Sequence, residues 1–146
     1  MKMTNEEYKQ YAEKHMPRSH SRRDALRAFV VGGTICTLGQ AFIEIYTALG
    51  MEPDAAGTAC SVTLIFIGAV LTGLGIYDKI AKFAGAGTLV PITGFSNSVV
   101  APALEFKTEG MILGTAAKMF IISGPVIVFG TSASVVYGLI YWISTL

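Results

Sequence analysis

Residues 55–77 form an unbroken stretch without a charged side chain, and this stretch constrains the fold more than any other feature. A helix needs about 20 apolar residues to cross the roughly 30 Å hydrocarbon core of a bilayer. Only 14% of the 146 residues are charged, against about 25% in an average soluble domain. The sequence therefore predicts an all-α integral membrane protein whose main solvent is the lipid bilayer.

A polar start and four hydrophobic regions organise the chain. Residues 1–24 are polar, and the part from Asn5 to His15 suits either a short amphipathic helix at the membrane surface or a partly ordered tail. The remainder, 25–146, is predicted to be a helical membrane domain. It consists of three long transmembrane helices and a broken (discontinuous or re-entrant) third hydrophobic element, in the order 25–49, 55–77, 85–106 (broken) and 110–143.

Charge placement predicts the orientation of the first two spans. Arg22, Arg23 and Arg27 lie at the start of the first span, and Lys79 and Lys82 follow the second. The turn between the spans carries only acidic charge. Because positive charge collects on the cytoplasmic side, the N-terminus and the lysine segment are predicted to be cytoplasmic.

The third hydrophobic element is punctuated by glycine, proline and small polar residues. Irregular backbone at membrane depth is tolerated only where protein or water covers it. A broken element, either a discontinuous span or a re-entrant pair of half-helices, is therefore favoured over a straight helix. Both remain open, and with them the side of the C-terminus. A kink is expected near Pro125 in the last helix. The predicted hinge or helix-breaking residues are Pro91, Gly94, Pro102 and Pro125.

The first span carries a polar stripe at four-residue spacing, which places Gly32, Cys36, Gln40 and Glu44 on one helix face. Such a face suits protein or a water path better than lipid. Glu44 has a second interpretation, in which it reaches water at the outer interface. For Gln40 we expect a hydrogen bond to another helix.

Lys118 is an isolated charge near the start of the last helix. It either snorkels to the interface or contacts an anion beside the broken element, where a half-helix N-terminus would carry partial positive charge. Asn97 and the neighbouring serines could instead cap that half-helix. The predicted solute path consists of Gln40, Glu44, Thr93, Gly94, Phe95, Ser96, Asn97 and Lys118.

Small residues at four-residue spacing predict close helix packing, as at Gly68 and Thr72. In the last helix the same pattern, Gly130, Ser134 and Gly138, suits packing within one subunit or contact in a homo-oligomer.

Enzymatic and nucleic-acid functions are not favoured. Both histidines, His15 and His20, lie in the polar N-terminal part, and no catalytic or metal-binding pattern accompanies them. Cys36 and Cys60 lie in apolar stretches and are expected to be inert packing residues. The net charge of +1 argues against nucleic acid. We therefore expect no enzyme activity, no metal and no cofactor.

Two long segments, GLGIYDKIAKFAGAG and VPITGFSNSVVAPALEFK, resemble the SpoVAC family, which comprises the stage V sporulation protein AC proteins of the SpoVA complex of spore-forming Firmicutes. The resemblance runs from about Arg27 to the end and includes GTAAKMFIISGPVIVFG. It implies a channel subunit in the inner membrane of the forespore and spore. Such a subunit would carry dipicolinic acid, as calcium dipicolinate, inward during sporulation and outward in germination, with mechanosensitive behaviour.

The resemblance also implies two partners, the membrane subunit AEb and the soluble subunit AD. It assigns no binding residues, so the solute path above rests on physical inference alone. The alternative function is a non-conducting structural or assembly subunit of the same complex, which docks a soluble partner through Lys79, Lys82 and the N-terminal tail.

Overall fold

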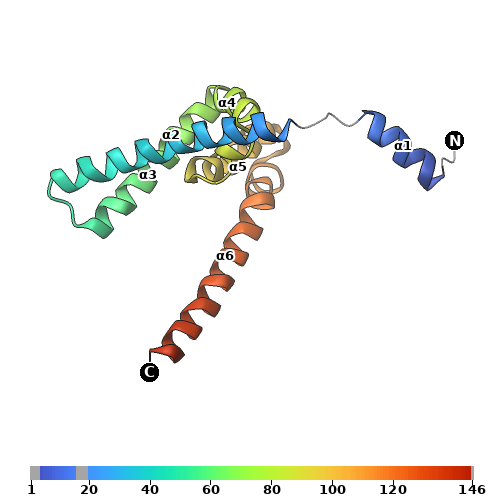
Figure 1. Ribbon diagram of the computed structural model, residues 1–146. Helices are drawn as coiled ribbons and strands as arrows, with labels where there is room; N and C mark the ends of the chain where they lie inside the picture. The colour runs from blue at the N-terminus through green and yellow to red at the C-terminus, as the bar shows by residue number, and fades with distance from the viewer. Residues whose placement is uncertain (1–3, 16–19, 146) are drawn as a thin grey trace.

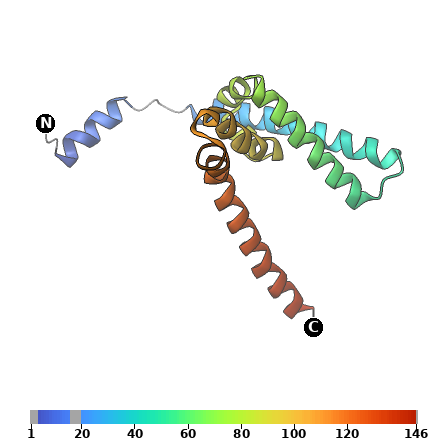
Figure 2. The ribbon, with the colours of Figure 1, turned by 180° about the vertical axis from the view of Figure 1, so that it is seen from behind.

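The computed structural model describes residues 4–15 and 20–145, and all regular structure in those two ranges is helical. Figures 1 and 2 show one long helical hairpin, a compact cluster of short helices near one of its ends, and a final helix that extends away from this cluster. The elements are α1 (Asn5–His15), α2 (Ser21–Ala48), α3 (Pro53–Gly73), α4 (Tyr77–Ala84), η1 (Gly85–Thr88), α5 (Ile92–Glu105), η2 (Lys107–Glu109), the π-helical turn η3 (Met111–Ala116) and α6 (Ala117–Ser144).

Helices α2 and α3 form the hairpin because α2 ends in a glycine turn and α3 begins with proline. Gly50 adopts φ +91°, and the amide of Met51 donates to the carbonyl of Tyr46 at 3.1 Å, which is a Schellman end. Pro53 opens α3, where its missing amide hydrogen costs nothing. Between the helices, the Cys60 thiol donates to the Gly39 carbonyl at 3.2 Å.

Three helices are long and apolar enough to cross a membrane, namely Ser21–Ala48, Pro53–Gly73 and Met111–Ser144. The predicted fold class, with three long helices and one broken hydrophobic element, is thereby confirmed. Residues 5–15 are helical, so of the two predicted states of the N-terminal segment the structure has the helix.

The broken element folds back on itself beside the hairpin. Residues 85–106 run through η1, the link 89–91 and α5, and α4 leads into them. One cavity is lined by both Asp78 of α4 and Glu105 at the end of α5, so the chain enters and leaves this element at the same end of the hairpin. Helix α5 has 14 residues and is about 21 Å long, too short to span a bilayer. This backbone course is that of the re-entrant form, and the placement of the element in the membrane stays a prediction.

Glycines allow the tip of the re-entrant element to approach the hairpin closely. A Cβ atom on Gly87 would overlap the backbone of Ala28 on α2, at 2.7 Å from its Cα. A Cβ atom on Gly68 of α3 would lie 3.1 Å from the Thr93 carbonyl oxygen. The predicted close packing at Gly68 and Thr72 is therefore confirmed, and the tip lies against both hairpin helices.

Only one of the four predicted hinge residues stands at a break. Pro91, with extended backbone, precedes α5, whereas Gly94 and Pro102 lie inside that helix. Pro125 lies inside α6, which is α-helical on both sides of it. The irregular turn is instead η3 at the start of the last helix, where the Thr115 amide donates to the Gly110 carbonyl, five residues back, at 2.9 Å. The view in Figure 2 shows α6 diverging from the hairpin after this turn.

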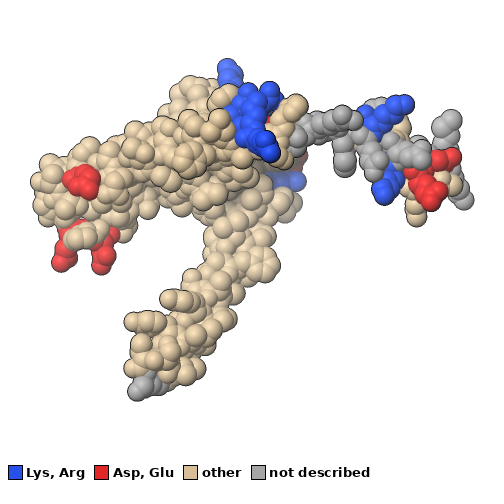
Figure 3. All heavy atoms as spheres, viewed as in Figure 1, with Lys and Arg blue, Asp and Glu red and all other residues tan. Residues whose placement is uncertain are grey.

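Charge is separated along the hairpin. Figure 3 shows acidic side chains at the turn end and basic side chains at the opposite end. The sequence puts Glu44, Glu52 and Asp54 near the turn, and Arg22, Arg23, Arg27, Lys79 and Lys82 near the other end.

Candidate functional site

The polar side chains of α5 join it to α3. The Ser96 hydroxyl donates to the Ile65 carbonyl at 2.8 Å, and the Thr72 hydroxyl donates to Asn97 Oδ1 at 3.0 Å. Ser96 is buried and Asn97 half-buried. Residue 91 occupies the N-cap of α5 without a side-chain cap bond, so the expectation that Asn97 or a serine caps this helix is wrong. These groups are engaged in helix packing.

Tyr77, at the start of α4, forms hydrogen bonds to both sides of the re-entrant tip, the segment around residues 88–93. Its ring is 3% exposed, and its hydroxyl lies 3.1 Å from both the Thr88 carbonyl oxygen and the Thr93 hydroxyl. Tyr77 begins α4, whereas Thr88 ends η1 and Thr93 opens α5. One hydroxyl thus joins three short helices, and Thr93 is buried in this contact.

A cavity of about 520 Å³ lies where α5 begins, between that helix and α6. Gly94, Phe95 and Ser98 line it from α5, and Ile122 and Val126 line it from α6. The link 89–91 forms the rest of its wall. The first amide groups of α5 have no acceptor within their helix and carry partial positive charge. The cavity therefore combines apolar walls with a helix terminus that favours negative charge.

A second cavity, of about 450 Å³, lies on the other side of α5 and is acidic. Asn97 lines it together with Asp78 and Glu105, and Thr72 contributes from α3. Asp78 is paired with Lys82 at 2.8 Å, and Glu105 adds a further carboxylate, which disfavours a dianion here. Of the predicted residues, Asn97 is therefore the least suited to contact an anionic solute.

Lys118 lies apart from this region. Its ammonium group is 4.3 Å from the centroid of the Phe106 ring, just beyond the end of α5. Phe106 is nine residues after Asn97, or about 13 Å along a helix. Lys118 is half-buried, and Phe106 stands between the charged residues Glu105 and Lys107 in the sequence, so the geometry favours the interfacial interpretation.

Gln40 and Glu44 lie on an exposed face of α2 near the acidic end. The Gln40 amide donates to Glu44 Oε1 at 2.9 Å, within the same helix. The expected bond from Gln40 to another helix is not the one present. Cys36, on the same face, is exposed, while Cys60 is buried, so of the two thiols predicted to be packing residues only Cys60 packs inside this chain.

The predicted solute-path residues therefore do not form one site. Gly94 and Phe95 line the cavity at the start of α5, Thr93, Ser96 and Asn97 serve packing, and Gln40, Glu44 and Lys118 lie elsewhere. Sequence reasoning missed Tyr77 because a tyrosine after an apolar run resembles an interfacial anchor. Among residues 4–15 and 20–145, no group of three His, Cys, Asp or Glu side chains is placed to share a metal ion.

Comparison with known proteins identifies the family. Residues 24–140 match the family described as SpoVAC/SpoVAEB sporulation membrane protein. The chain is 45% identical over 141 residues to stage V sporulation protein AC of Bacillus subtilis (strain 168), and the match covers 94% of each chain. No solved structure matches significantly. The family match contains α3 to η3 entirely and all but the outer ends of α2 and α6, and the chain belongs to the SpoVAC/SpoVAEB family of sporulation membrane proteins.

Proposed function

We propose that this protein is a channel subunit through which dipicolinate crosses the inner membrane of the forespore and spore. The observation that carries the proposal is the position of the α5 N-terminus, which lies at the cavity between α5 and α6. Dipicolinate is a planar aromatic dianion. The helix terminus attracts its charge, and Phe95 with the apolar wall of α6 accepts its ring.

Depth along the hairpin supports this role for the cavity. Ser96, in the first turns of α5, bonds to Ile65, which lies eight residues before the end of α3. Eight residues correspond to about 12 Å, so the start of α5 is well inside the hydrocarbon layer. Irregular backbone at that depth requires cover by protein or water. Val90 at the tip is 90% exposed in one chain, which leaves this cover to a second subunit or a water path.

A related membrane subunit is the partner we propose for this cover. The matching family description names SpoVAEB beside SpoVAC, so two similar subunits with similar re-entrant elements could enclose one path between them. A second copy of this chain could do the same. The soluble subunit AD would then dock at the basic end of the hairpin, through Lys79 and Lys82.

The test uses spores in which variants replace the native protein. Phe95→Ala removes the aromatic wall of the cavity, and Phe129→Ala, on a part of α6 that is 74% exposed, is the matched control. We expect Phe95→Ala to change dipicolinate content or release about tenfold, the effect of about 1.4 kcal/mol. The control should behave as the unmodified protein. Equal behaviour of the two variants, at equal protein levels, would remove this cavity from the path.

The alternative is a non-conducting assembly subunit. What favours it is that Thr93, Ser96 and Asn97 are already engaged in packing within the chain. Flux of dipicolinate from liposomes distinguishes the two functions. Liposomes that contain this protein and its membrane partner should release dipicolinate if the subunit conducts, and liposomes with the partner alone should not. Release that is the same with and without this chain would favour the assembly role.

A further inference from the structure

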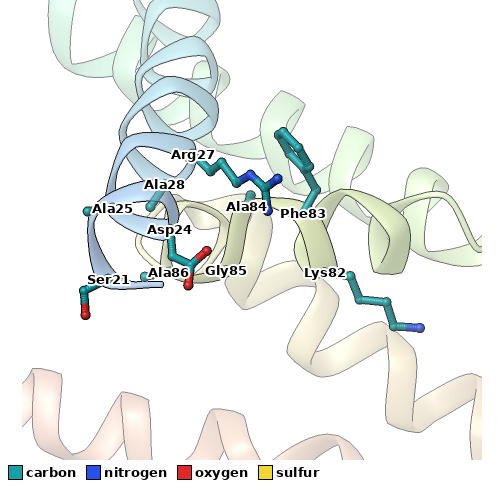
Figure 4. Close-up of a pocket in the computed structure, with 10 residues that line it drawn as sticks. All are labelled: Ser21, Asp24, Ala25, Arg27, Ala28, Lys82, Phe83, Ala84, Gly85 and Ala86. Atoms are coloured by element: carbon teal, nitrogen blue, oxygen red, sulfur yellow. The ribbon is translucent and has the colours of Figure 1, made fainter. Parts of the chain in front are cut away.

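A cavity of about 470 Å³ opens at the basic end of the hairpin, between the start of α2 and the α4–η1 corner (Figure 4). Arg27 and Ser21 line it from α2, and Lys82, Phe83 and Gly85 line it from the other side. The cavity lies where the basic residues at the end of the hairpin meet the apolar spans. Its position is therefore that of a lipid headgroup in the leaflet that the basic residues face.

Arg27 gives this cavity an available positive charge. Its guanidinium stacks 4.7 Å from the centroid of the Phe83 ring, and in Figure 4 it extends from α2 toward that ring. Among the described parts of the chain it forms no ion pair. A stacked guanidinium keeps its donor edge free, and arginine is suited to bind phosphate through two donors.

The other charges near the cavity are held by partners of their own. Asp24 also lines it, but its carboxylate accepts a hydrogen bond from the His20 amide at 3.1 Å and lies 4.0 Å from the Arg23 side chain. Lys82 pairs with Asp78 at 2.8 Å, in an exposed contact that can rearrange. With Arg22 and Lys79 nearby, positive charge exceeds negative charge at this end of the hairpin.

An apolar groove continues from the cavity toward the middle of α2. It has a volume of about 360 Å³ and is lined by Phe29, Gly33 and Cys36 of α2, and by Val90 and Pro91 of the re-entrant tip. Ala28 and Ala86 line both the groove and the basic cavity. The two therefore form one composite site, with a basic head and an apolar tail that follows the spanning helix.

We propose that this composite site binds one anionic phospholipid. The phosphate lies at Arg27 with Lys82 beside it, and one acyl chain follows α2 past Gly33 to Cys36. Charge selects an anionic headgroup, and the groove selects an acyl chain over a free phosphate. Because Gly87 contacts Ala28 where the two parts meet, the bound lipid also holds the re-entrant tip against α2. The groove adjoins the cavity at the start of α5 along Val90 and Pro91, but the basic head of the site shares no residue with that cavity. Lipid binding at this head is therefore proposed independently of the transport function.

The test measures lipid binding to the purified full-length protein in detergent, by native mass spectrometry after delipidation. The probes are phosphatidylglycerol, phosphatidylcholine and water-soluble glycerol 3-phosphate. Arg27→Gln with Lys82→Gln removes two interfacial positive charges and should weaken phosphatidylglycerol binding about 30-fold. Arg22→Gln with Lys79→Gln removes equal charge outside the cavity and should have a much smaller effect. Arg27→Lys should keep much of the affinity.

Gly33→Phe tests the tail of the site. Nothing lies within 4 Å of a Cβ atom at Gly33, so the ring can enter the groove without disturbing the backbone. We expect weaker phosphatidylglycerol binding in this variant with an unchanged circular dichroism spectrum. Equal affinity for phosphatidylglycerol and phosphatidylcholine would overturn the proposal. So would equal losses in the two double variants, or glycerol 3-phosphate binding as tightly as the lipid.

Discussion

At the scale of single residues, hydroxyl groups and glycines hold the re-entrant element in place. Ser96 and Thr72 bond across the α3–α5 contact, and Tyr77 joins the base to the tip. Gly68 and Gly87 remove the side chains that would keep the backbones apart. Within the membrane, where apolar burial gives little driving force between helices, such close packing and polar bonds carry the association.

Tyr77→Phe should lower stability because it leaves the buried Thr88 carbonyl without its tyrosine donor. An unsatisfied buried group costs about 1–3 kcal/mol. The free energy of unfolding, measured by titration with denaturing detergent in mixed micelles, should fall by an amount in this range. Tyr137→Phe is the control, since that ring is 71% exposed on α6. Equal stability of the two variants would contradict the role given to Tyr77.

Gly87→Ala should also destabilise the protein. The added methyl group would overlap the backbone of Ala28, and such overpacking costs about 1–3 kcal/mol. Gly33→Ala on α2 is the control, because nothing lies within 4 Å of a Cβ atom there. It should be neutral or raise stability by up to about 1 kcal/mol through helix propensity. The same unfolding titration compares the two. A Gly87→Ala protein as stable as Gly33→Ala would show that the tip is not packed on α2.

At the scale of elements, the long spans were predictable and the re-entrant form was not. Continuous apolar runs and flanking charge set the predicted spans 25–49 and 55–77 close to α2 and α3. The prolines and glycines of 85–106 indicated a break but not its course. That course depends on contacts between distant residues, such as Tyr77 with Thr93 and Ser96 with Ile65, which no local pattern encodes. For the same reason, the polar groups of α5 could not be assigned to packing from sequence.

Helix α1 begins with a reciprocal cap that predicts a pH dependence. The Thr4 amide donates to Glu7 Oε2 at 2.8 Å, and the Glu7 amide donates to the Thr4 hydroxyl at 3.4 Å. The bond from the Thr4 amide, aided by the Thr4 side chain, lowers the pKa of Glu7 below its ordinary value of 4.5. The cap is therefore fully formed above pH 4.5, and its stabilisation is lost as pH falls through the lowered pKa.

Amide exchange of α1 in the full-length protein measures this effect. Protection in the first turn should be constant at neutral pH and should fall in acid. Glu7→Gln should remove the pH dependence, while Glu6→Gln, which changes the charge of the same turn, should retain it. A first turn whose protection has the same acid dependence in Glu7→Gln as in the unmodified protein would show that another group is responsible.

At the scale of the whole molecule, the hairpin has a basic and an acidic end (Figure 3). The positions of the later elements can be described relative to these two ends. The re-entrant element begins and ends at the basic end, so α6 starts there as well. Beyond Gly124 the side chains of α6 are exposed in one chain, up to residue 145. This surface, with Gly130, Ser134 and Gly138, is open to lipid and to a second subunit, and the prediction of an oligomer contact there stays a prediction.

Three membrane crossings, with the re-entrant element returning to the same side, predict where the C-terminus lies. With α2, α3 and α6 as the crossings, residue 145 should be on the side of the acidic turn and opposite the lysine segment. If residues 85–106 crossed fully, residue 145 would instead share the side of Lys79.

Single cysteines at Glu52, Lys79 and Thr145 separate these cases, in a background where Cys36 and Cys60 are serine. The serine hydroxyl can replace the Cys60 thiol as donor to Gly39, so this background should fold. In sealed vesicles of one orientation, an impermeant maleimide should label Thr145→Cys together with Glu52→Cys and leave Lys79→Cys unlabelled until the vesicles are opened. Labelling of Thr145→Cys together with Lys79→Cys would mean four crossings, and the short helix α5 would then have to belong to a full span.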